Sequence, residues 1–187
     1  MKKLLGLLTV LMLACVVLSA FPVSAGIPFC WFNKWISEDG CWNKAPTTVT
    51  ATLGEDVYWT MAISVDLRWV SVAGAIENVV VTDRFGAEIE IVGYDPGDTM
   101  PASHGSATYS INGNSDKVFL TWNIGTLPFG EMATLIFEIS TDHNPADHQE
   151  YTSPGCYELN SGAVLKFTYG GKRYSAYTLP ITVSVTP

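Results

Sequence analysis

Apolar and polar residues alternate along most of the chain after residue 45. The period is two, which places every second side chain on one face of a β-strand. The longest example has Val57, Trp59, Met61, Ile63 and Val65 on one face. Similar alternation recurs at residues 47–53, 78–83, 88–94, 106–111, 117–124, 132–141, 165–169, 172–177 and 181–185. This part of the chain shows no helical period, so the sequence predicts an all-β domain.

Turn residues separate the predicted strands at the spacing of β-hairpins. They are Asn112-Gly113, between residues 106–111 and 117–124, and Gly170-Gly171, between residues 165–169 and 172–177. Such dipeptides suit tight turns because their backbones accept positive φ angles. Short strands joined by turns, in a chain of this size, favour an immunoglobulin-like two-sheet β-sandwich.

The first 25 residues follow a different pattern. Two lysines precede an almost unbroken apolar run from Leu4 to Ala20, and the small residues Val23-Ser24-Ala25 lie before Gly26. This order is typical of a secretory signal peptide that is cleaved after Ala25. Because the run is at the short end for a membrane span, a retained N-terminal anchor is the less favoured alternative. We therefore expect a signal peptide at residues 1–25 and an exported protein.

Residues 26–45 differ in composition from the predicted sandwich at residues 46–187, and we expect them to form a small N-terminal cap or docking segment. They hold Trp31, Trp35 and Trp42 among charged and amide side chains. Exposed tryptophans can stack on sugar rings or anchor a protein partner. The alternative is that these three cover an open end of the sandwich.

After the predicted cleavage the chain retains three cysteines, Cys30, Cys41 and Cys156. An oxidising compartment favours a disulfide, either between Cys30 and Cys41 or between one of them and Cys156. The remaining thiol would be buried or available for an intermolecular bond. The spacing of the three is not that of a zinc site.

The charge of the chain argues against some classes of partner. Its formal net charge is −8, and loss of Lys2 and Lys3 with the signal peptide would make it −10. Nucleic acids and anionic membranes both attract clustered Lys and Arg, so an acidic surface disfavours them. No second long apolar segment follows the first, so we expect no membrane span in the mature chain. The partners we expect are other surface proteins, further copies of this chain, or a glycan.

Candidate chemistry is sparse in the sequence. Asp142, His143, Asp147 and His148 form the densest set of ligand-type side chains. They are weak metal candidates, because a polar loop between two strands is the favoured explanation for them. The chain has no G-x-S-x-G nucleophile motif. We therefore predict that the protein is not an enzyme and needs no cofactor.

The sequence also offers candidates for one covalent modification, an isopeptide cross-link between side chains. Some surface sandwiches contain an intramolecular Lys–Asn isopeptide cross-link, although most lysines simply lie at the surface. In this chain the combination suggested by the sequence is Lys166 with Asn160 or Asn123, assisted by Glu138.

Several motifs resemble a known family. They are ENVVVTD at residues 77–83, WNIGTL at 122–127, GEMATL at 130–135, NPA at 144–146, QEYTSPG at 149–155 and LNSGA at 159–163. Together they look like the conserved-repeat, immunoglobulin-like domain of archaeal and bacterial cell-surface proteins, a domain of unknown function. The resemblance covers about residues 47–185. It implies a sandwich fold at the cell envelope and assigns no catalytic residue.

The sequence thus favours a secreted or cell-surface structural protein that assembles through protein–protein contacts. In this hypothesis residues 26–45 and 178–187 could each add a strand to the sheet edge of a neighbour. The alternative is a carbohydrate-binding or adhesion module that uses exposed tryptophans.

Overall fold

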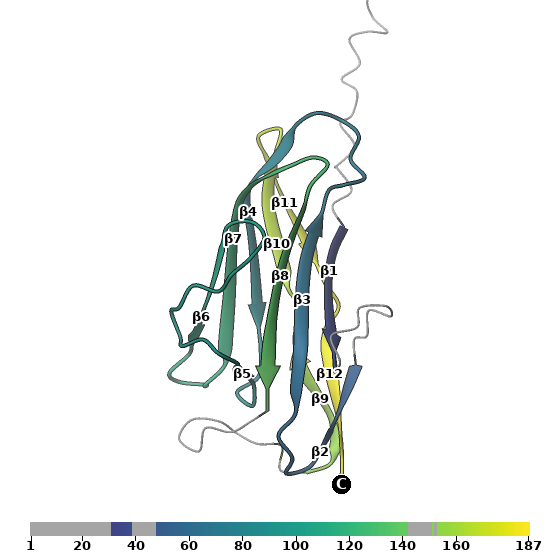
Figure 1. The fold of residues 1–187 in the computed structure, drawn as a ribbon, viewed down its shortest axis with the longest axis vertical. Coiled ribbons are helices and arrows are strands. Elements are labelled where there is room, and N and C mark those ends of the chain that lie inside the picture. The colour runs from purple at the N-terminus through teal and green to yellow at the C-terminus, as the bar shows by residue number, and fades with distance from the viewer. Residues whose placement is uncertain (1–30, 39–47, 142–150, 152) are drawn as a thin grey trace, which may run out of the picture.

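The computed structural model describes residues 31–38, 48–141, 151 and 153–187, which form strands and no helix (Figure 1). The strands are β1 (Trp31–Ser37), β2 (Thr48–Thr52), β3 (Tyr58–Asp66), β4 (Ala75–Arg84), β5 (Glu90–Ile91), β6 (Ser106–Ile111), β7 (Val118–Pro128), β8 (Met132–Ser140), β9 (Gly155–Asn160), β10 (Val164–Tyr169), β11 (Lys172–Tyr177) and β12 (Ile181–Thr186). The prediction of an all-β, immunoglobulin-like sandwich is confirmed.

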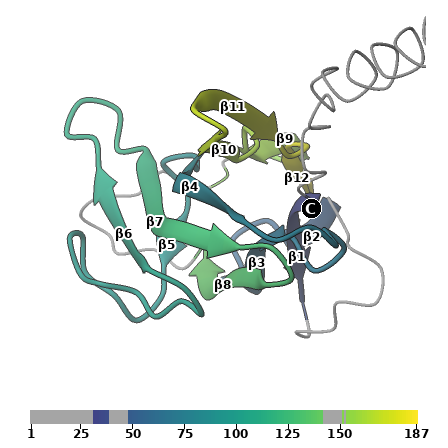
Figure 2. The same cartoon turned by 90° about the horizontal axis from the view of Figure 1, so that it is seen from above.

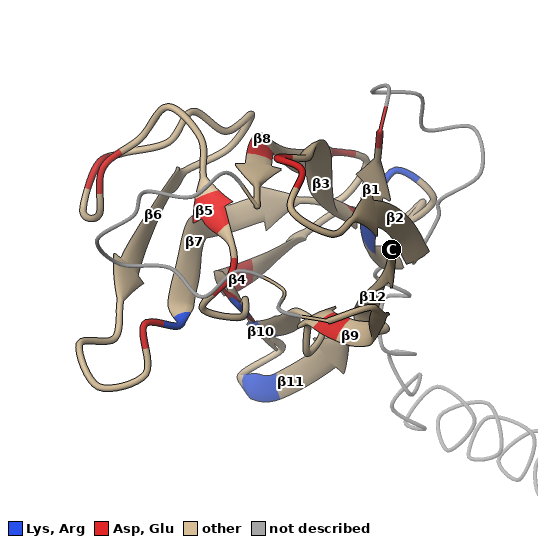
Figure 3. Cartoon of the chain, turned by 90° about the horizontal axis from the view of Figure 1, so that it is seen from below, with Lys and Arg blue, Asp and Glu red and all other residues tan. Residues whose placement is uncertain are grey.

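Three hydrogen-bonded sheets build the sandwich. Their strand orders are β1-β3-β8-β5, β11-β10-β4-β7-β6 and β2-β12-β9. In the end-on views the four-stranded and five-stranded sheets form opposite layers, and the three-stranded sheet lies at one side between β1 and β10 (Figures 2 and 3). Each sheet therefore contributes side chains to the same enclosed core.

The alternating residues of β3 fill this core, as the sequence predicts. Trp59, Met61, Ile63 and Val65 are all buried. On the opposite face of β3, Ala62 is buried too. Its side chain is small and is flanked by the larger Trp35 on β1 and Ile136 on β8, which lie directly opposite it.

A β-bulge in β4 changes which of its side chains face the core. Asn78 has a positive φ of 52°, and the register of β4 against β7 shifts between Ile76 and Val79. An extra residue at this point lets both Ile76 and Val79 point inward although three positions separate them. The alternation that restarts at Val79 continues through Val81 and places Asp83 on the inner face.

Both predicted hairpins are present. Tyr169 pairs with Lys172 around the two-residue turn Gly170-Gly171. Between β6 and β7 the loop is longer than the predicted Asn-Gly turn, since Ile111 pairs with Val118. The strand predicted at residues 88–94 is reduced to the two residues of β5.

The two segments that we expected to donate strands to a neighbour are used within the sandwich. Residues 31–37 of the predicted cap form β1, which pairs with β3 along its whole length. Residues 181–186 form β12, which has β2 on one side and β9 on the other. β12 pairs on both sides and is therefore not a free donor, whereas β1 pairs with β3 alone and lies at the edge of the four-stranded sheet.

Candidate functional site

Three polar side chains meet in the core where the three sheets come together. Lys34 extends from β1 of the four-stranded sheet, Asp83 from β4 of the five-stranded sheet, and Asn160 from the end of β9 in the three-stranded sheet. We call these residues the Lys–Asp–Asn cluster. Two short contacts bring β4 and β9 together here: a bridge between Phe85 and Asn160, and a hydrogen bond from the amide N–H of Gly86 to the carbonyl of Leu159.

The cluster is tightly connected. The Lys34 Nζ lies 3.3 Å from Asp83 Oδ2 and 3.4 Å from Oδ1 and also donates to the side-chain carbonyl oxygen of Asn160. The Asn160 Nδ2 donates to Asp83 Oδ1 at 2.6 Å. Each of the three side chains therefore contacts the other two, so an amine, a carboxyl group and a carboxamide share one small volume.

Two backbone groups fix the orientation of the Asn160 carboxamide. Its Nδ2 also donates to the carbonyl of Arg84 at 3.1 Å, and its Oδ1 accepts the amide N–H of Gly162 at 2.8 Å. Gly162 has a φ of +92°, and a Cβ at this position would lie 2.6 Å from the carbonyl oxygen of Thr178. The Gly162 N–H can therefore point at the carboxamide only because the residue is glycine.

The cluster is enclosed. Lys34 is 6% exposed, Asp83 4% and Asn160 1%. Burial lowers the pKa of the Lys34 amine, against the opposing effect of Asp83 and, more weakly, of Glu158. Burial also raises the pKa of the Asp83 carboxyl, against the opposing effect of Lys34 and of hydrogen bonds from Asn160 and Arg84. Burial thus acts against the charged form of both groups.

The sequence offered Asn160 and Asn123 as partners for Lys166, whereas in the structure a different lysine contacts Asn160. Lys166 is exposed on β10, and Glu138 is exposed on β8. The lysine that contacts Asn160 is Lys34, and the nearby acid is Asp83. The missed signal was a charged residue at an inward position of an alternating strand, since Lys34 lies between Phe32 and Ile36.

Two of the three tryptophans of the predicted cluster lie in the described part of the chain. Trp31 is 59% exposed and Trp35 is half-buried, whereas Trp42 lies outside the described residues. Trp69, which the sequence analysis did not single out, is 77% exposed in the loop after β3. Since Trp31 pairs with Asp66, Trp31 and Trp69 lie at the same end of the sandwich.

Most of the other predicted site residues lie outside the described part of the chain. Cys30 and Cys41 lie outside the described residues, as do Asp142, His143, Asp147 and His148. Cys156 on β9 is an exposed free thiol. In the described part of the chain, no group of three or more His, Cys, Asp or Glu side chains is placed to hold a metal ion.

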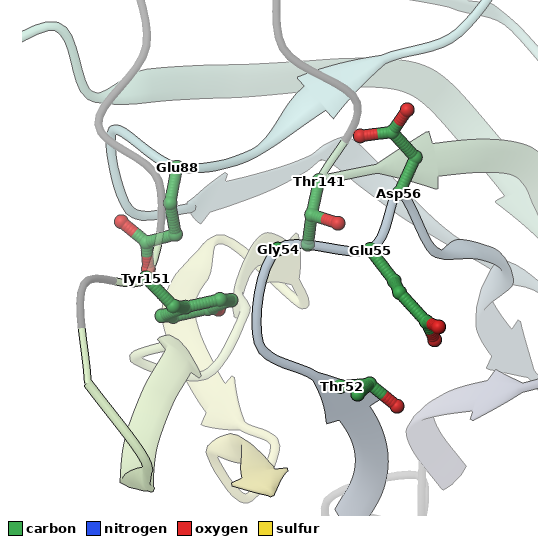
Figure 4. A pocket seen from close by; sticks show the side chains of 7 residues that line it. All are labelled: Thr52, Gly54, Glu55, Asp56, Glu88, Thr141 and Tyr151. Atoms are coloured by element: carbon green, nitrogen blue, oxygen red, sulfur yellow. The ribbon is translucent and has the colours of Figure 1, made fainter. Parts of the chain in front are cut away.

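A surface pocket lies between the β2–β3 turn and the region of Tyr151. It is lined by Thr52, Gly54, Glu55, Asp56, Glu88, Thr141 and Tyr151 (Figure 4). Burial raises the pKa of Glu88 and also that of Tyr151. In Figure 4 Glu88 lies on the Tyr151 side, whereas Glu55 and Asp56 lie across the pocket.

Basic residues are spread over separate strands and loops of the described chain rather than gathered on one face (Figure 3). None of the described segments is a helix that could cross a membrane.

Comparisons with known proteins show no family for this chain. No protein-family profile matches the chain. An uncharacterized protein of Archaeoglobus fulgidus is 34% identical over 93 residues, which is 48% of this chain and 31% of that protein. The chain thus spans about a third of the length of this relative. The resemblance to the conserved-repeat domain remains a prediction.

Two solved structures show similar folds. The major pilin subunit BcpA of Bacillus cereus aligns with a TM-score of 0.47 and 15% identity, over 84% of this chain and 40% of the pilin. The three N-terminal domains of the type V pili tip protein Mfa5 from Porphyromonas gingivalis align with a TM-score of 0.42 and 21% identity, over 59% of this chain and 22% of that chain. At these identities the likeness concerns the sandwich fold alone.

Proposed function

We propose that the protein is a non-catalytic structural component of the cell surface that assembles with further copies of itself. The Lys–Asp–Asn cluster is the observation that carries this proposal. It is sealed in the core, where no substrate reaches it, and it fastens β1 to β9, the neighbour of the C-terminal strand β12. A force that pulls on the two ends of the chain would have to break this connection before β1 could separate. The predicted signal peptide supports a location outside the cytoplasm.

The outer edge of β11 is the surface that fits self-association. β11 is the last strand of the five-stranded sheet, and Tyr177 and Leu179 beside it are each 72% exposed. The Thr178 N–H donates to Ala163, so the alternating N–H groups of Arg173, Ser175 and Tyr177 point away from β10. Unpaired N–H groups next to exposed apolar side chains form an edge onto which another strand can add.

The test is the solution mass of residues 26–187 by size-exclusion chromatography with light scattering, with and without reductant. We expect an oligomer whose population increases with protein concentration and that persists in reductant. A monomer under both conditions, across the accessible concentrations, would contradict the proposal.

A matched pair of variants assigns the contact. Ser175→Pro removes one outward N–H from β11 and leaves the pairing with β10 intact, because proline is tolerated on the free side of an edge strand. Ser175→Ala retains that N–H and serves as the control. We expect the proline variant to weaken association and the alanine variant to behave as the wild type. Equal association of both variants would exclude the β11 edge.

A second candidate function is glycan binding, and the exposure of Trp31 and Trp69 at one end of the sandwich favours it. Sugar rings stack on tryptophan, so binding should quench and shift the fluorescence emission. Titration of surface polysaccharides against the wild type and Trp69→Ala measures this effect. An unchanged emission with every glycan would leave only the structural function.

A further inference from the structure

The Lys–Asp–Asn cluster has the composition of an acyl-transfer site whose nucleophile and electrophile belong to the same chain. The amine of Lys34 contacts the carboxamide of Asn160, and the carboxyl group of Asp83 contacts both nitrogens. Holding the reacting groups in contact makes an otherwise bimolecular reaction intramolecular, which is equivalent to a very high local concentration.

We propose that Lys34 and Asn160 react in the folded protein to form an isopeptide bond, with Asp83 as the proton-transfer residue. The inference does not rest on the proposed cell-surface function, because it follows from the contacts in the core alone.

The reaction balances without a further reactant. The lone pair of Lys34 Nζ attacks Cγ of Asn160, a C–N bond forms, and the bond from Cγ to Nδ2 breaks. Nδ2 leaves as ammonia. The attacking amine loses one proton and the leaving nitrogen gains one, so Asp83 ends in its starting protonation state. Neither oxidation nor reduction takes place.

Each described contact has a part in this reaction. Asp83 Oδ2 lies 3.3 Å from Nζ, where it can take the proton, and Oδ1 lies 2.6 Å from Nδ2, to which the carboxyl group can deliver one. Negative charge develops on Asn160 Oδ1 when Cγ becomes tetrahedral. The Gly162 N–H, 2.8 Å from this oxygen, is placed to stabilise that charge.

The protonation states also suit the reaction. An amine attacks only when its nitrogen is uncharged, and an acid must carry a proton to deliver it. Burial lowers the pKa of Lys34 and raises the pKa of Asp83, and both shifts are toward these forms. Glu158 on β9 is the other charged group that acts on Lys34 and favours the ammonium form, but its effect is smaller than that of burial.

The surroundings separate water from the reacting amine. The Lys34 and Asp83 side chains have no exposed surface. Asn160 also lines a small surface pocket, together with residues that include Arg84, Gly86, Lys117 and Ser161. The leaving group thus forms at the residue of the cluster that borders a surface pocket.

Intact-mass spectrometry of the purified protein tests the proposal. We expect a mass lower than that of the sequence by one ammonia molecule and, after trypsin digestion, a branched peptide that joins the segments containing Lys34 and Asn160. A folded wild-type protein with the full sequence mass would overturn the proposal, and this result requires no variant.

Variants separate the cross-link from other losses of ammonia. An asparagine can also lose ammonia by cyclising onto its own backbone, and that reaction does not need a lysine. We expect Lys34→Met to restore the full mass and Lys166→Met, the control at the exposed lysine, to retain the loss. Persistence of the loss in Lys34→Met would overturn the proposal.

A third variant tests the role of Asp83. Removal of a general acid–base typically slows a reaction by about 10²–10⁴-fold. Asp83→Asn should therefore have the full mass when freshly purified and lose ammonia only on long incubation, provided that its tryptophan emission shows a folded core. Cross-linking at the wild-type rate in this folded variant would exclude Asp83 as the proton-transfer residue.

Discussion

A double variant with Lys34→Met and Asp83→Asn distinguishes a covalent from a non-covalent cluster by its stability. We expect a lower melting temperature if Lys34 and Asn160 are cross-linked in the wild type, and an unchanged or higher one if they are not. Methionine retains the length of the lysine stem without its amine. Asparagine at position 83 still presents an oxygen to the amide N–H of Arg84, which donates to Asp83 Oδ1 at 3.0 Å. The double variant thus removes the reaction and the two buried ionisable groups while preserving most of the shape of the core.

The expected magnitude follows from the loop that the bond closes. Lys34 and Asn160 are 126 residues apart. By the loop-closure model used for disulfides, a cross-link over that distance stabilises the fold by about 5 kcal/mol. Loss of this contribution should lower the melting temperature by about 10–20 °C in a protein of this size. Without a covalent bond, exchange of a buried ionisable pair for neutral side chains is usually neutral or stabilising by about 1–4 kcal/mol.

The assay is thermal and urea unfolding followed by circular dichroism, in reductant so that no cysteine contributes a cross-link. Lys166→Met is the control, because that lysine is exposed on β10 and its loss should change the free energy of unfolding by no more than about 0.5 kcal/mol. A double variant that melts at or above the wild-type temperature would refute the reasoning, since the closed loop would then contribute nothing.

Three further predictions concern other parts of the molecule. Gly105→Ala should destabilise the fold by more than about 1 kcal/mol in urea unfolding. Gly105 has a φ of +67°, and a Cβ there would lie 1.8 Å from the carbonyl oxygen of Asn123. An unchanged urea midpoint would contradict this close approach. The Arg68 guanidinium hydrogen-bonds to Asp66 and holds the pKa of that carboxyl below its usual value. The wild type should therefore be more stable than Asp66→Asn by about 0.2–1 kcal/mol at pH 7, and the advantage should disappear as the pH falls below about 4; a pH-independent difference would count against the pair. Cys156 is exposed and should react with a maleimide in the folded protein, and Cys156→Ser should not be labelled at this position. A wild-type protein that is not labelled at Cys156 would show that the thiol is covered.

Local sequence patterns determined the class of fold. Alternation with period two is a property of a single strand, so it identified β3, β7 and β8 without knowledge of their partners. The Gly170-Gly171 pair likewise predicted its hairpin, because the chain reverses within the turn itself. Where the pattern was short, as at residues 88–94, the prediction overstated the strand.

Only the tertiary structure decided the site. Lys34 and Asp83 occupy inward positions of alternating strands, but a charged residue in such a pattern can also mark the end of a buried stretch. Burial becomes favourable only when partners satisfy the charge. Those partners lie 49 and 126 residues from Lys34, in two other sheets. Local patterns carry no information on pairing over such distances. The sequence therefore offered Asn160 as one of two asparagines and did not indicate the lysine and the acid that contact it.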